Sequence, residues 1–289
     1  MPRDADELLT LLDLERLDDD LFRGSQMPTS RPMVFGGQVA AQSLVAASLT
    51  VEEPYVAHSL HSYFLQPGDP SVPTIYDVDN LRDGRSFVTR RVVAQQHGRP
   101  IYAQTVNFQK EESGYEHEES MPDVPGPDHE SVRPVSRQVQ EELHADQWDV
   151  ADIRFVGSSS GRLEPDPMHP GRQQVWLRVS SRLPDDQFWH RAAFTYLSDM
   201  TLIGAAMAPQ GISFGRGDAF VASLDHAVWF HRPFRADEWW LYDQVSPSAS
   251  SGRGLTIARV FSQDGHLVAS VAQEAVLRPR KTAPSERAK

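Results

Sequence analysis

Asp199 is a carboxylate on what the sequence predicts to be the apolar side of a helix. In TYLSDMTLIGAAM, apolar side chains recur at three- and four-residue spacing, and Asp199 falls on the same stripe. A carboxylate that faces a core needs a specific partner, because an unpaired buried charge is strongly unfavourable. The apolar members of the stripe are Tyr196, Met200, Ile203 and Met207.

Gln273 and Ser223 occupy comparable positions on predicted strands. LVASVAQEAVL alternates with period two, so Gln273 is expected on an otherwise apolar face. Ser223 begins the run SLDHAVWF and is expected to share a face with Ala227 and Trp229. A buried carboxylate, hydroxyl or amide costs about 1–3 kcal/mol or more if it has no partner. We therefore predict that Asp199, Ser223 and Gln273 meet around a water molecule or a ligand.

Composition limits the function classes. The 289-residue chain has no cysteine, which excludes disulfides, thiolate metal ligands and a cysteine nucleophile. The longest uncharged stretch, residues 32–51, is too polar to span a membrane, and the acidic N-terminus lacks the pattern of a signal peptide. A net charge of −12 argues against nucleic acid as a general partner. We expect a soluble cytoplasmic protein without a membrane partner.

The predicted elements form two similar groups. A helix from about Gly37, in GGQVAAQSLVAASLT, precedes four strand candidates, which are AHSLHSYFLQP, SVPTIYDVDNLR, RSFVTRRVVAQQ and RPIYAQTVNFQ. The helix that contains Asp199 precedes another four, which are VASLDHAVWFHRPF, EWWLYDQVSP, GLTIARVFSQ and LVASVAQEAVL. Between the groups lie an acidic, proline-rich stretch, a polar helix candidate in SVRPVSRQVQEEL, and the strand candidates ADIRFV and RQQVWLRVSSRL.

The second group repeats the first. A shift of 166 residues places Tyr63-Phe64-x-x-Pro67 on Trp229-Phe230-x-x-Pro233, and Tyr76-Asp77 on Tyr242-Asp243. Two copies of a helix wrapped by an antiparallel sheet, joined edge to edge, predict an α+β double hotdog fold with one continuous sheet. We expect an N-terminal repeat at 1–112, a linker with a surface helix at 113–150, a C-terminal repeat that carries the active site at 151–280, and a flexible tail at 281–289.

The two copies differ where chemistry is expected. Gln273 corresponds to Val106 and Ser223 to Ala57, while Asp199 is expected to fall near Gln38 of the first copy. Only the second copy therefore carries the polar trio. One active site per chain is the consequence.

The chain resembles the type II acyl-CoA thioesterases (TesB-type), a family of double hotdog enzymes. The matching stretches cover both halves in order, and they include VFGGQVAAQSL, HSLHSYFLQPGDP, YLSDM, LDHAVWFHRPFRADEWWLY and LVASVAQEAVLR. The resemblance implies hydrolysis of fatty acyl-CoA to a fatty acid and CoA, a role in fatty acid metabolism, and a homo-oligomer (dimer or tetramer). It also implies that Asp199, at a helix start, holds the hydrolytic water with Ser223 and Gln273. The family more often has threonine at the position of Ser223.

The expected mechanism needs no cofactor, metal or covalent intermediate. Asp199, its pKa raised by burial, would accept a proton from water as general base, while Ser223 and Gln273 orient that water. Backbone N–H groups at a helix start would stabilise the oxyanion, and Gly36 and Gly37 would allow the acyl carbonyl to approach closely.

Five arginines are candidates for binding the phosphates of CoA, although a solvated surface role explains them equally well. Asp225-His226 resembles a catalytic dyad, but adjacent strand residues point to opposite faces, so structural use is favoured, as it is for His58 and His61. Gly211-Ile212-Ser213-Phe214-Gly215 matches a nucleophile elbow without the required preceding strand. The five arginines are Arg85, Arg90, Arg91, Arg232 and Arg253.

Two other functions remain open on this fold. One is a non-catalytic acyl-CoA-binding protein. The other is an enoyl-CoA hydratase, which ordinarily pairs an aspartate with a histidine on the active helix, and the expected helix has no histidine. Release of free thiol from acyl-CoA would distinguish hydrolysis from both.

Overall fold

A computed structural model describes residues 1–29, 31–134, 149–156, 168, 170–212 and 219–280. The first half contains α1 (Ala5–Leu12), β1 (Glu15–Asp18), β2 (Leu21–Gly24), α2 (Gly36–Ser48), β3 (Tyr55–Phe64), β4 (Thr74–Asp83), β5 (Phe87–Gln96) and β6 (Arg99–Lys110). The second half contains β7 (Arg133–Pro134), β8 (Ala151–Phe155), β9 (Arg172–Val179), α4 (Gln187–Ser198), α5 (Gly204–Met207), the 3₁₀ helix η1 (Ala208–Gln210), β10 (Ala219–Ser223), β11 (Asp225–Phe230), β12 (Trp240–Ser250), β13 (Arg253–Ser262) and β14 (Leu267–Pro279).

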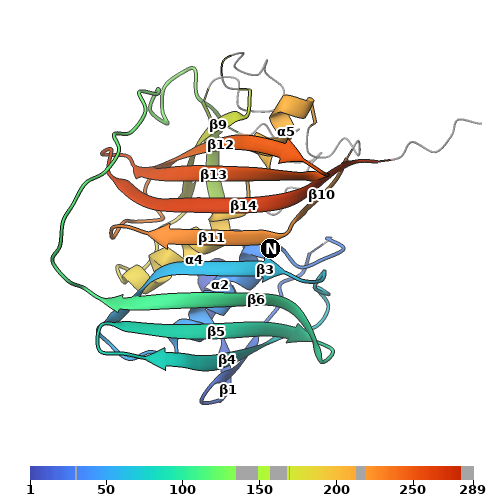
Figure 1. Cartoon of the computed structure of the whole chain (residues 1–289), viewed down its shortest axis with the longest axis vertical. Helices are drawn as coiled ribbons and strands as arrows, with labels where there is room; N and C mark the ends of the chain where they lie inside the picture. The colour runs from blue at the N-terminus through green and yellow to red at the C-terminus, as the bar shows by residue number, and fades with distance from the viewer. Residues whose placement is uncertain (30, 135–148, 157–167, 169, 213–218, 281–289) are drawn as a thin grey trace, which may run out of the picture.

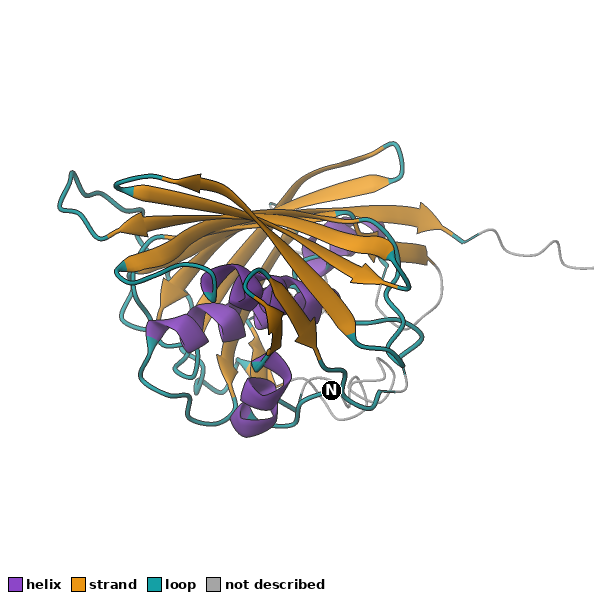
Figure 2. Ribbon diagram, turned by 90° about the horizontal axis from the view of Figure 1, so that it is seen from below, coloured by secondary structure: helices purple, strands orange, loops and turns teal. Residues whose placement is uncertain are grey.

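All the strands belong to one antiparallel sheet, which confirms the predicted fold class. The strand order is β1-β2-β4-β5-β6-β3-β11-β14-β13-β12-β9-β8-β7, with β10 paired to β14 (Figure 1). The two halves join where β3 pairs with β11, with Ser62 opposite His226. The helices lie on one face of this sheet (Figure 2). The larger of two hydrophobic core clusters extends through both halves between that face and the helices.

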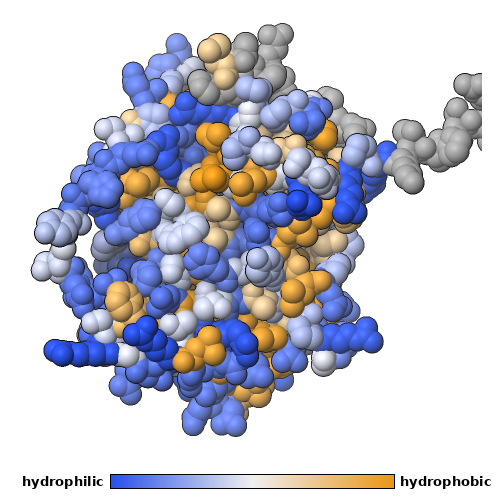
Figure 3. All heavy atoms as spheres, viewed as in Figure 1, coloured by the Kyte–Doolittle hydropathy of each residue, from blue (hydrophilic) through white to orange (hydrophobic). Residues whose placement is uncertain are grey.

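The other face of the sheet is partly open to solvent and partly covered by the segment before β7, where Trp176 Nε1 donates to the Pro125 carbonyl and Leu241 and Phe261 are fully buried. Figure 3 shows polar side chains mixed with smaller apolar areas over these strands. Tyr63, Trp229 and Ile257 are among the exposed apolar residues of this sheet. Their scattered placement is compatible with a solvated antiparallel sheet.

Strand pairing follows the internal repeat. Tyr76 pairs with Ala94 in the first half, and Tyr242 pairs with Val260 in the second, so both partners are displaced by 166 residues. Each half also has a one-residue irregularity at the same place, between Ala57 and Ser59 in β3 and at Leu224 between β10 and β11. The structure thus reproduces the two-copy pattern at the level of register.

Helix α2 is wrapped on nearly all sides, as its lack of charge predicts. Its residues from Gly37 to Ala47 are buried. The start of α2 packs against the end of α4: a Cβ on Gly37 would lie 2.2 Å from the Tyr196 carbonyl oxygen. Only glycine allows the two backbones to approach this closely.

The prediction of one helix running through Asp199 is wrong. Helix α4 ends at Ser198, Asp199 caps its C-terminus, and the chain turns before the short α5. The Ser198 carbonyl accepts a hydrogen bond at 3.0 Å from the hydroxyl of Tyr242 instead of continuing the helical ladder. The predicted equivalence of Asp199 and Gln38 is wrong for the same reason. Asp199 lies at a helix end, as Leu49 does after α2, whereas Gln38 lies in the first turn of α2.

The prediction that Ser223 shares a face with Ala227 and Trp229 is also wrong. Ser223 pairs with Ala275, but Ala227 pairs with Ala272, so the chain gains one residue at Leu224 relative to β14. An extra residue reverses the alternation of side chains beyond it. Ser223 and His226 consequently both face the helices, and Trp229 faces outward.

Some expectations fall on residues outside the described part. These are most of the polar helix candidate at residues 131–143, the tail at 281–289, and the last three residues of the G-x-S-x-G match. The described residues before that match form η1, not a strand. Strand β6 ends at Lys110, and strand β8 begins at Ala151. The exact domain boundaries stay a prediction.

Candidate active site

Asp199, Ser223 and Gln273 lie within hydrogen-bond distance of one another. Gln273 Nε2 donates to Asp199 Oδ1 at 2.9 Å and to Ser223 Oγ at 2.8 Å. Ser223 Oγ donates to Asp199 Oδ1 at 3.3 Å. The C-cap of α4, the last residue of β10 and the middle of β14 supply the three side chains. The amide N–H groups of Gln273 are therefore directed to Asp199 and Ser223, and the hydroxyl of Ser223 is directed to Asp199.

The surroundings of Asp199 favour its neutral form more strongly than water does. The residue is half-buried by its accessible surface, but its carboxyl group lies deep among packed side chains. This burial raises the pKa of Asp199, and the opposing effects of His226, Gln273, Arg31 and Ser223 are smaller. A carboxylate whose pKa is raised toward neutrality is a better proton acceptor at cellular pH.

The second carboxylate oxygen of Asp199 faces the start of helix α2. A Cβ on Gly36 would lie 2.6 Å from Asp199 Oδ2, so a side chain there would displace the carboxylate. The N-cap residue of this helix, Phe35, makes no side-chain capping hydrogen bond. The first N–H groups of a helix have no intrahelical partner, and the N-terminus carries partial positive charge. Gly36 thus lies beside Asp199, whereas Gly37 packs against Tyr196 and Phe35, and the contact of both glycines with the acyl carbonyl stays a prediction.

His226 belongs to the same network, and the sequence analysis assigned it no such place. Its side chain is completely buried, with Nδ1 at 2.7 Å from Gln273 Oε1 and Nε2 at 2.8 Å from Ser198 Oγ. Burial lowers the pKa of His226, and the nearby Asp199 opposes this shift. Counting with period two from Ser223 places His226 on the opposite face. The extra residue at Leu224, which this counting does not reveal, brings both side chains to the same face.

His226 and Gln273 are part of a row of buried polar side chains that crosses five neighbouring strands. The strand pairing places Gln104 opposite Ser62, Ser62 opposite His226, and Gln273 opposite Thr256. Each of these residues is buried. Ser62 Oγ donates to the His226 carbonyl at 2.7 Å, and this hydrogen bond joins β3 of the first half to β11 of the second half.

Arg31 is a second residue that the sequence analysis did not select. Its guanidinium group lies 5.2 Å from the centre of the Phe35 ring, immediately before helix α2. Its positive charge opposes the rise in the pKa values of both Asp199 and Tyr196 that burial causes. Arg31 is therefore an arginine of the described chain whose charge acts on the site.

The five arginines proposed for CoA binding are dispersed. Arg90 is buried and bonds Thr50 and Asp83, near the other end of α2. Arg91 and Arg253 pair with Asp79 and Glu274. Arg85 lies in the turn between β4 and β5. Their role in phosphate binding stays a prediction.

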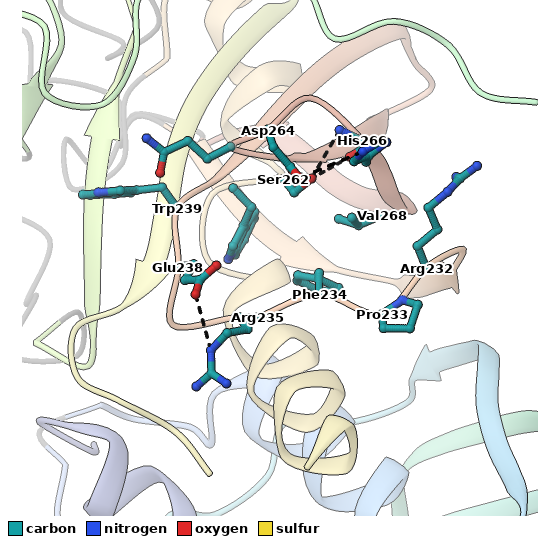
Figure 4. A pocket seen from close by; sticks show the side chains of 12 residues that line it. Arg232, Pro233, Phe234, Arg235, Glu238, Trp239, Ser262, Asp264, His266 and Val268 are labelled. Carbon is teal, nitrogen blue, oxygen red and sulfur yellow. Dashed lines mark hydrogen bonds and ion pairs between the residues drawn. The ribbon is translucent and has the colours of Figure 1, made fainter. Parts of the chain in front are cut away.

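Arg232 lies at a separate hollow of about 560 Å³ between the β11–β12 connection and the β13–β14 turn (Figure 4). None of Asp199, Ser223 and Gln273 lines it. Arg232 pairs there with Glu118, as does His266, and Arg235 pairs with Asp185, Asp237 and Glu238. The cations of this hollow are thus already compensated by acids.

Three other histidines of the described chain, His58, His61 and His190, have partners outside the trio. Helix α4 begins earlier than expected and does contain a histidine, His190, which corrects the earlier statement about the active helix. However, His190 is near the opposite end of α4 from Asp199, and its Nδ1 accepts a hydrogen bond from the Ala236 N–H. His58 packs against Phe87, and His61 packs against Trp229. Among the described residues, no group of three or more His, Asp or Glu side chains could hold a metal ion, and no helix could span a membrane.

Comparison with known proteins agrees with this combination of fold and site. The model of the acyl-CoA thioesterase family matches residues 153–276, and that of the acyl-CoA thioesterase N-terminal domain matches residues 24–109. The chain belongs to the acyl-CoA thioesterase family, which confirms the resemblance stated above.

Relatives match nearly the whole length of the chain. Acyl-coenzyme A thioesterase 8 of Homo sapiens is 36% identical over 93% of this chain and 88% of its own length. Acyl-CoA thioesterase 2 of Haemophilus influenzae is 36% identical over 94% of this chain and 96% of its own. The crystal structure of an acyl-CoA thioesterase II, TesB2, from Mycobacterium marinum has a TM-score of 0.81 and 44% identity, and the match covers 95% of this chain and 99% of that one.

Proposed function

We propose that this chain hydrolyses fatty acyl-CoA to a free fatty acid and CoA, with Asp199 as general base. The observation that carries the proposal is the junction of Asp199, Ser223 and Gln273, three side chains from distant parts of the chain. Membership of the acyl-CoA thioesterase family supports the substrate class.

The two oxygens of Asp199 would have different tasks. Oδ1 accepts the hydrogen bonds from Gln273 and Ser223, which fix the plane of the carboxylate. Oδ2 is directed toward Gly36 and would accept the proton of the attacking water. Ser223 and Gln273 would thus position the water chiefly by positioning its base, although either can also contact it directly.

The start of helix α2 would complete the reaction centre. The water oxygen attacks the thioester carbonyl carbon while its proton passes to Asp199. The N–H groups of Gly36 and Gly37 would then stabilise the negative charge on the carbonyl oxygen. Collapse of the tetrahedral intermediate breaks the C–S bond and releases the fatty acid and CoA thiolate, which takes up the proton held by Asp199 and so restores the base. Oxyanion donors of this kind typically contribute about 10²–10³-fold to kcat.

A panel of acyl-CoA thioesters tests this proposal through release of free thiol. The panel should range from short to long and from straight to branched acyl chains. Hydrolysis of at least one member by the wild-type chain, with a large loss in Asp199→Asn, is the expected result. Binding of acyl-CoA without thiol release would indicate the non-catalytic alternative. Loss of enoyl absorbance without thiol release would indicate the hydratase.

A further inference from the structure

The side chain of His226 determines which way the Gln273 amide points. An amide can lie in two orientations that have nearly the same shape, with its NH₂ group and its oxygen exchanged. In the structure, the NH₂ group of Gln273 faces Asp199 and Ser223, and its oxygen faces His226 Nδ1 at 2.7 Å. These contacts limit which protonation states the network can adopt.

An ionised Asp199 requires this orientation. A carboxylate only accepts hydrogen bonds, so the group of Gln273 that lies 2.9 Å from Asp199 Oδ1 must be the NH₂ group. Its oxygen then faces His226, and Nδ1 of His226 must carry a proton to donate to it. The inverted amide would place its oxygen against Asp199 Oδ1, which is tolerated only if Asp199 is protonated and unable to act as a base.

Ser198 completes the argument on the other side of the ring. A neutral histidine with its proton on Nδ1 has an acceptor at Nε2. Ser198 Oγ lies 2.8 Å from this nitrogen and 3.0 Å from the Thr195 carbonyl oxygen. Its single hydroxyl proton can be donated to either of these acceptors; when the ring is neutral with its proton on Nδ1, the hydroxyl donates to Nε2 rather than to the Thr195 carbonyl, and the complete burial of both residues excludes water as a competitor. The lowered pKa of His226 agrees with a neutral ring.

We infer that His226 is a positioning residue: as the neutral Nδ1–H tautomer, with Nε2 accepting from Ser198, it fixes the Gln273 amide in the orientation that keeps Asp199 ionised. The inference rests on the proposed function, since it concerns the same base. His226 does not touch the water or the substrate and acts through Gln273. No proton leaves His226 during the reaction.

Two variants of His226 separate this role from a general contribution to packing. The side-chain nitrogen of asparagine can take the place of Nδ1, and that of glutamine the place of Nε2. His226→Asn should therefore retain the hydrogen bond to Gln273 and keep kcat within about tenfold of the wild type. His226→Gln should lose it, and kcat should fall by about 10- to 100-fold, the effect of a hydrogen bond to a charged network. KM should stay similar in both.

The pH profile adds a readout that packing alone would not change. In His226→Gln, the amide can invert, so the pKa of Asp199 rises further and the acidic limb of kcat/KM moves to higher pH. In His226→Asn, the limb stays in place. Ser198→Ala removes the hydroxyl that donates to Nε2 of this tautomer and should give an intermediate loss. Equal kcat values and equal limbs for the asparagine and glutamine variants would overturn the inference.

¹⁵N NMR of the wild-type chain tests the tautomer without relying on activity or on a stable variant. The chain has 11 histidines, and His190 is as deeply buried as His226, so the His226 signal is assigned through its correlations with the assigned backbone. A protonated Nδ1 with an unprotonated Nε2 is expected. An Nε2–H tautomer or a charged ring at neutral pH would refute the inference, even if thiol release shows that the chain is a thioesterase. Failure of the wild-type chain to release thiol would refute the proposed function instead, and this role of His226 with it.

Discussion

Gly36 lies so close to Asp199 that a Cβ on the glycine would come within 2.6 Å of the carboxylate Oδ2. The contact joins the first turn of α2 in one repeat to the C-cap of α4 in the other. Because neither residue could move without shifting a buried helix, the contact fixes the distance between the proposed base and the proposed oxyanion donors. The predictions below test parts of this arrangement.

Gly36→Ala should lower kcat by about tenfold or more, because its Cβ must displace either Asp199 or the Phe64 ring, which lies 2.8 Å from the same point. Thiol release and thermal denaturation should be measured together. Gly114→Ala is the matched control, since a Cβ there would have no atom within 4 Å. Wild-type kcat in Gly36→Ala would show that the close contact is not needed for turnover.

Asp199→Asn should lower kcat by about 10²–10⁴-fold, the usual contribution of a general base. It should not lower the melting temperature. The folded-state pKa of Asp199 is raised above its unfolded value, so the wild-type carboxylate reduces stability as pH rises from the unfolded pKa, about 3.9, through the folded pKa. The variant lacks this effect. Its stability relative to the wild type should thus increase over that window, as urea denaturation at several pH values can measure.

Wild-type activity should fall on the acidic side at a pH above the ordinary range for an aspartate. The base must be deprotonated to accept a proton, and burial raises its pKa. The acidic limb of kcat/KM reports this pKa in the free enzyme. A limb at or below pH 4, the ordinary range of an aspartate, would contradict the assignment.

Ser223→Ala should reduce kcat by about 10- to 100-fold, since it removes a hydroxyl that bonds both Gln273 Nε2 and Asp199 Oδ1. Ser223→Thr keeps the hydroxyl and adds a methyl group that restricts its rotation. Activity equal to or greater than the wild type is expected for this variant. If alanine is tolerated as well as threonine, the hydroxyl has no part in the reaction.

Asp243→Ala should cost about 1.5–3 kcal/mol of folding stability, because it removes a buried carboxylate that accepts charge-assisted hydrogen bonds, while Arg172 and Arg259 stay partly exposed to solvent. Asp243 is almost fully buried and bonds Arg172, Gln174 and Arg259, which links β12 to both of its neighbours. Asp79→Ala is the control. Its exposed pair with Arg91 should contribute about 0–1 kcal/mol. Chemical denaturation gives both values, and a similar small loss in each would contradict the assigned importance of the buried cluster.

The sequence predicted the double hotdog fold because the alternation of apolar residues can be read within each strand, and the internal repeat is supported by many positions at once. It also selected Asp199, Ser223 and Gln273, whose polar character conflicts with their apolar neighbours. It did not predict where α4 ends, since the hydroxyl of Tyr242, distant in sequence, takes the Ser198 carbonyl. Nor did it place His226 beside Gln273, because one additional residue at Leu224 changes the face of every residue after it.

The first repeat has the same register irregularity, between Ala57 and Ser59, as the second has at Leu224. However, the positions that correspond to Ser223, Gln273 and Asp199 hold the apolar residues Ala57, Val106 and Leu49. In the proposed centre, the N-terminal copy thus contributes backbone, through Gly36, and the C-terminal copy contributes the proposed reactive side chains. On this proposal, neither half contains a complete centre. After duplication, such halves are no longer free to evolve separately, and exchanging one of them between distant relatives should break activity even where both parts fold.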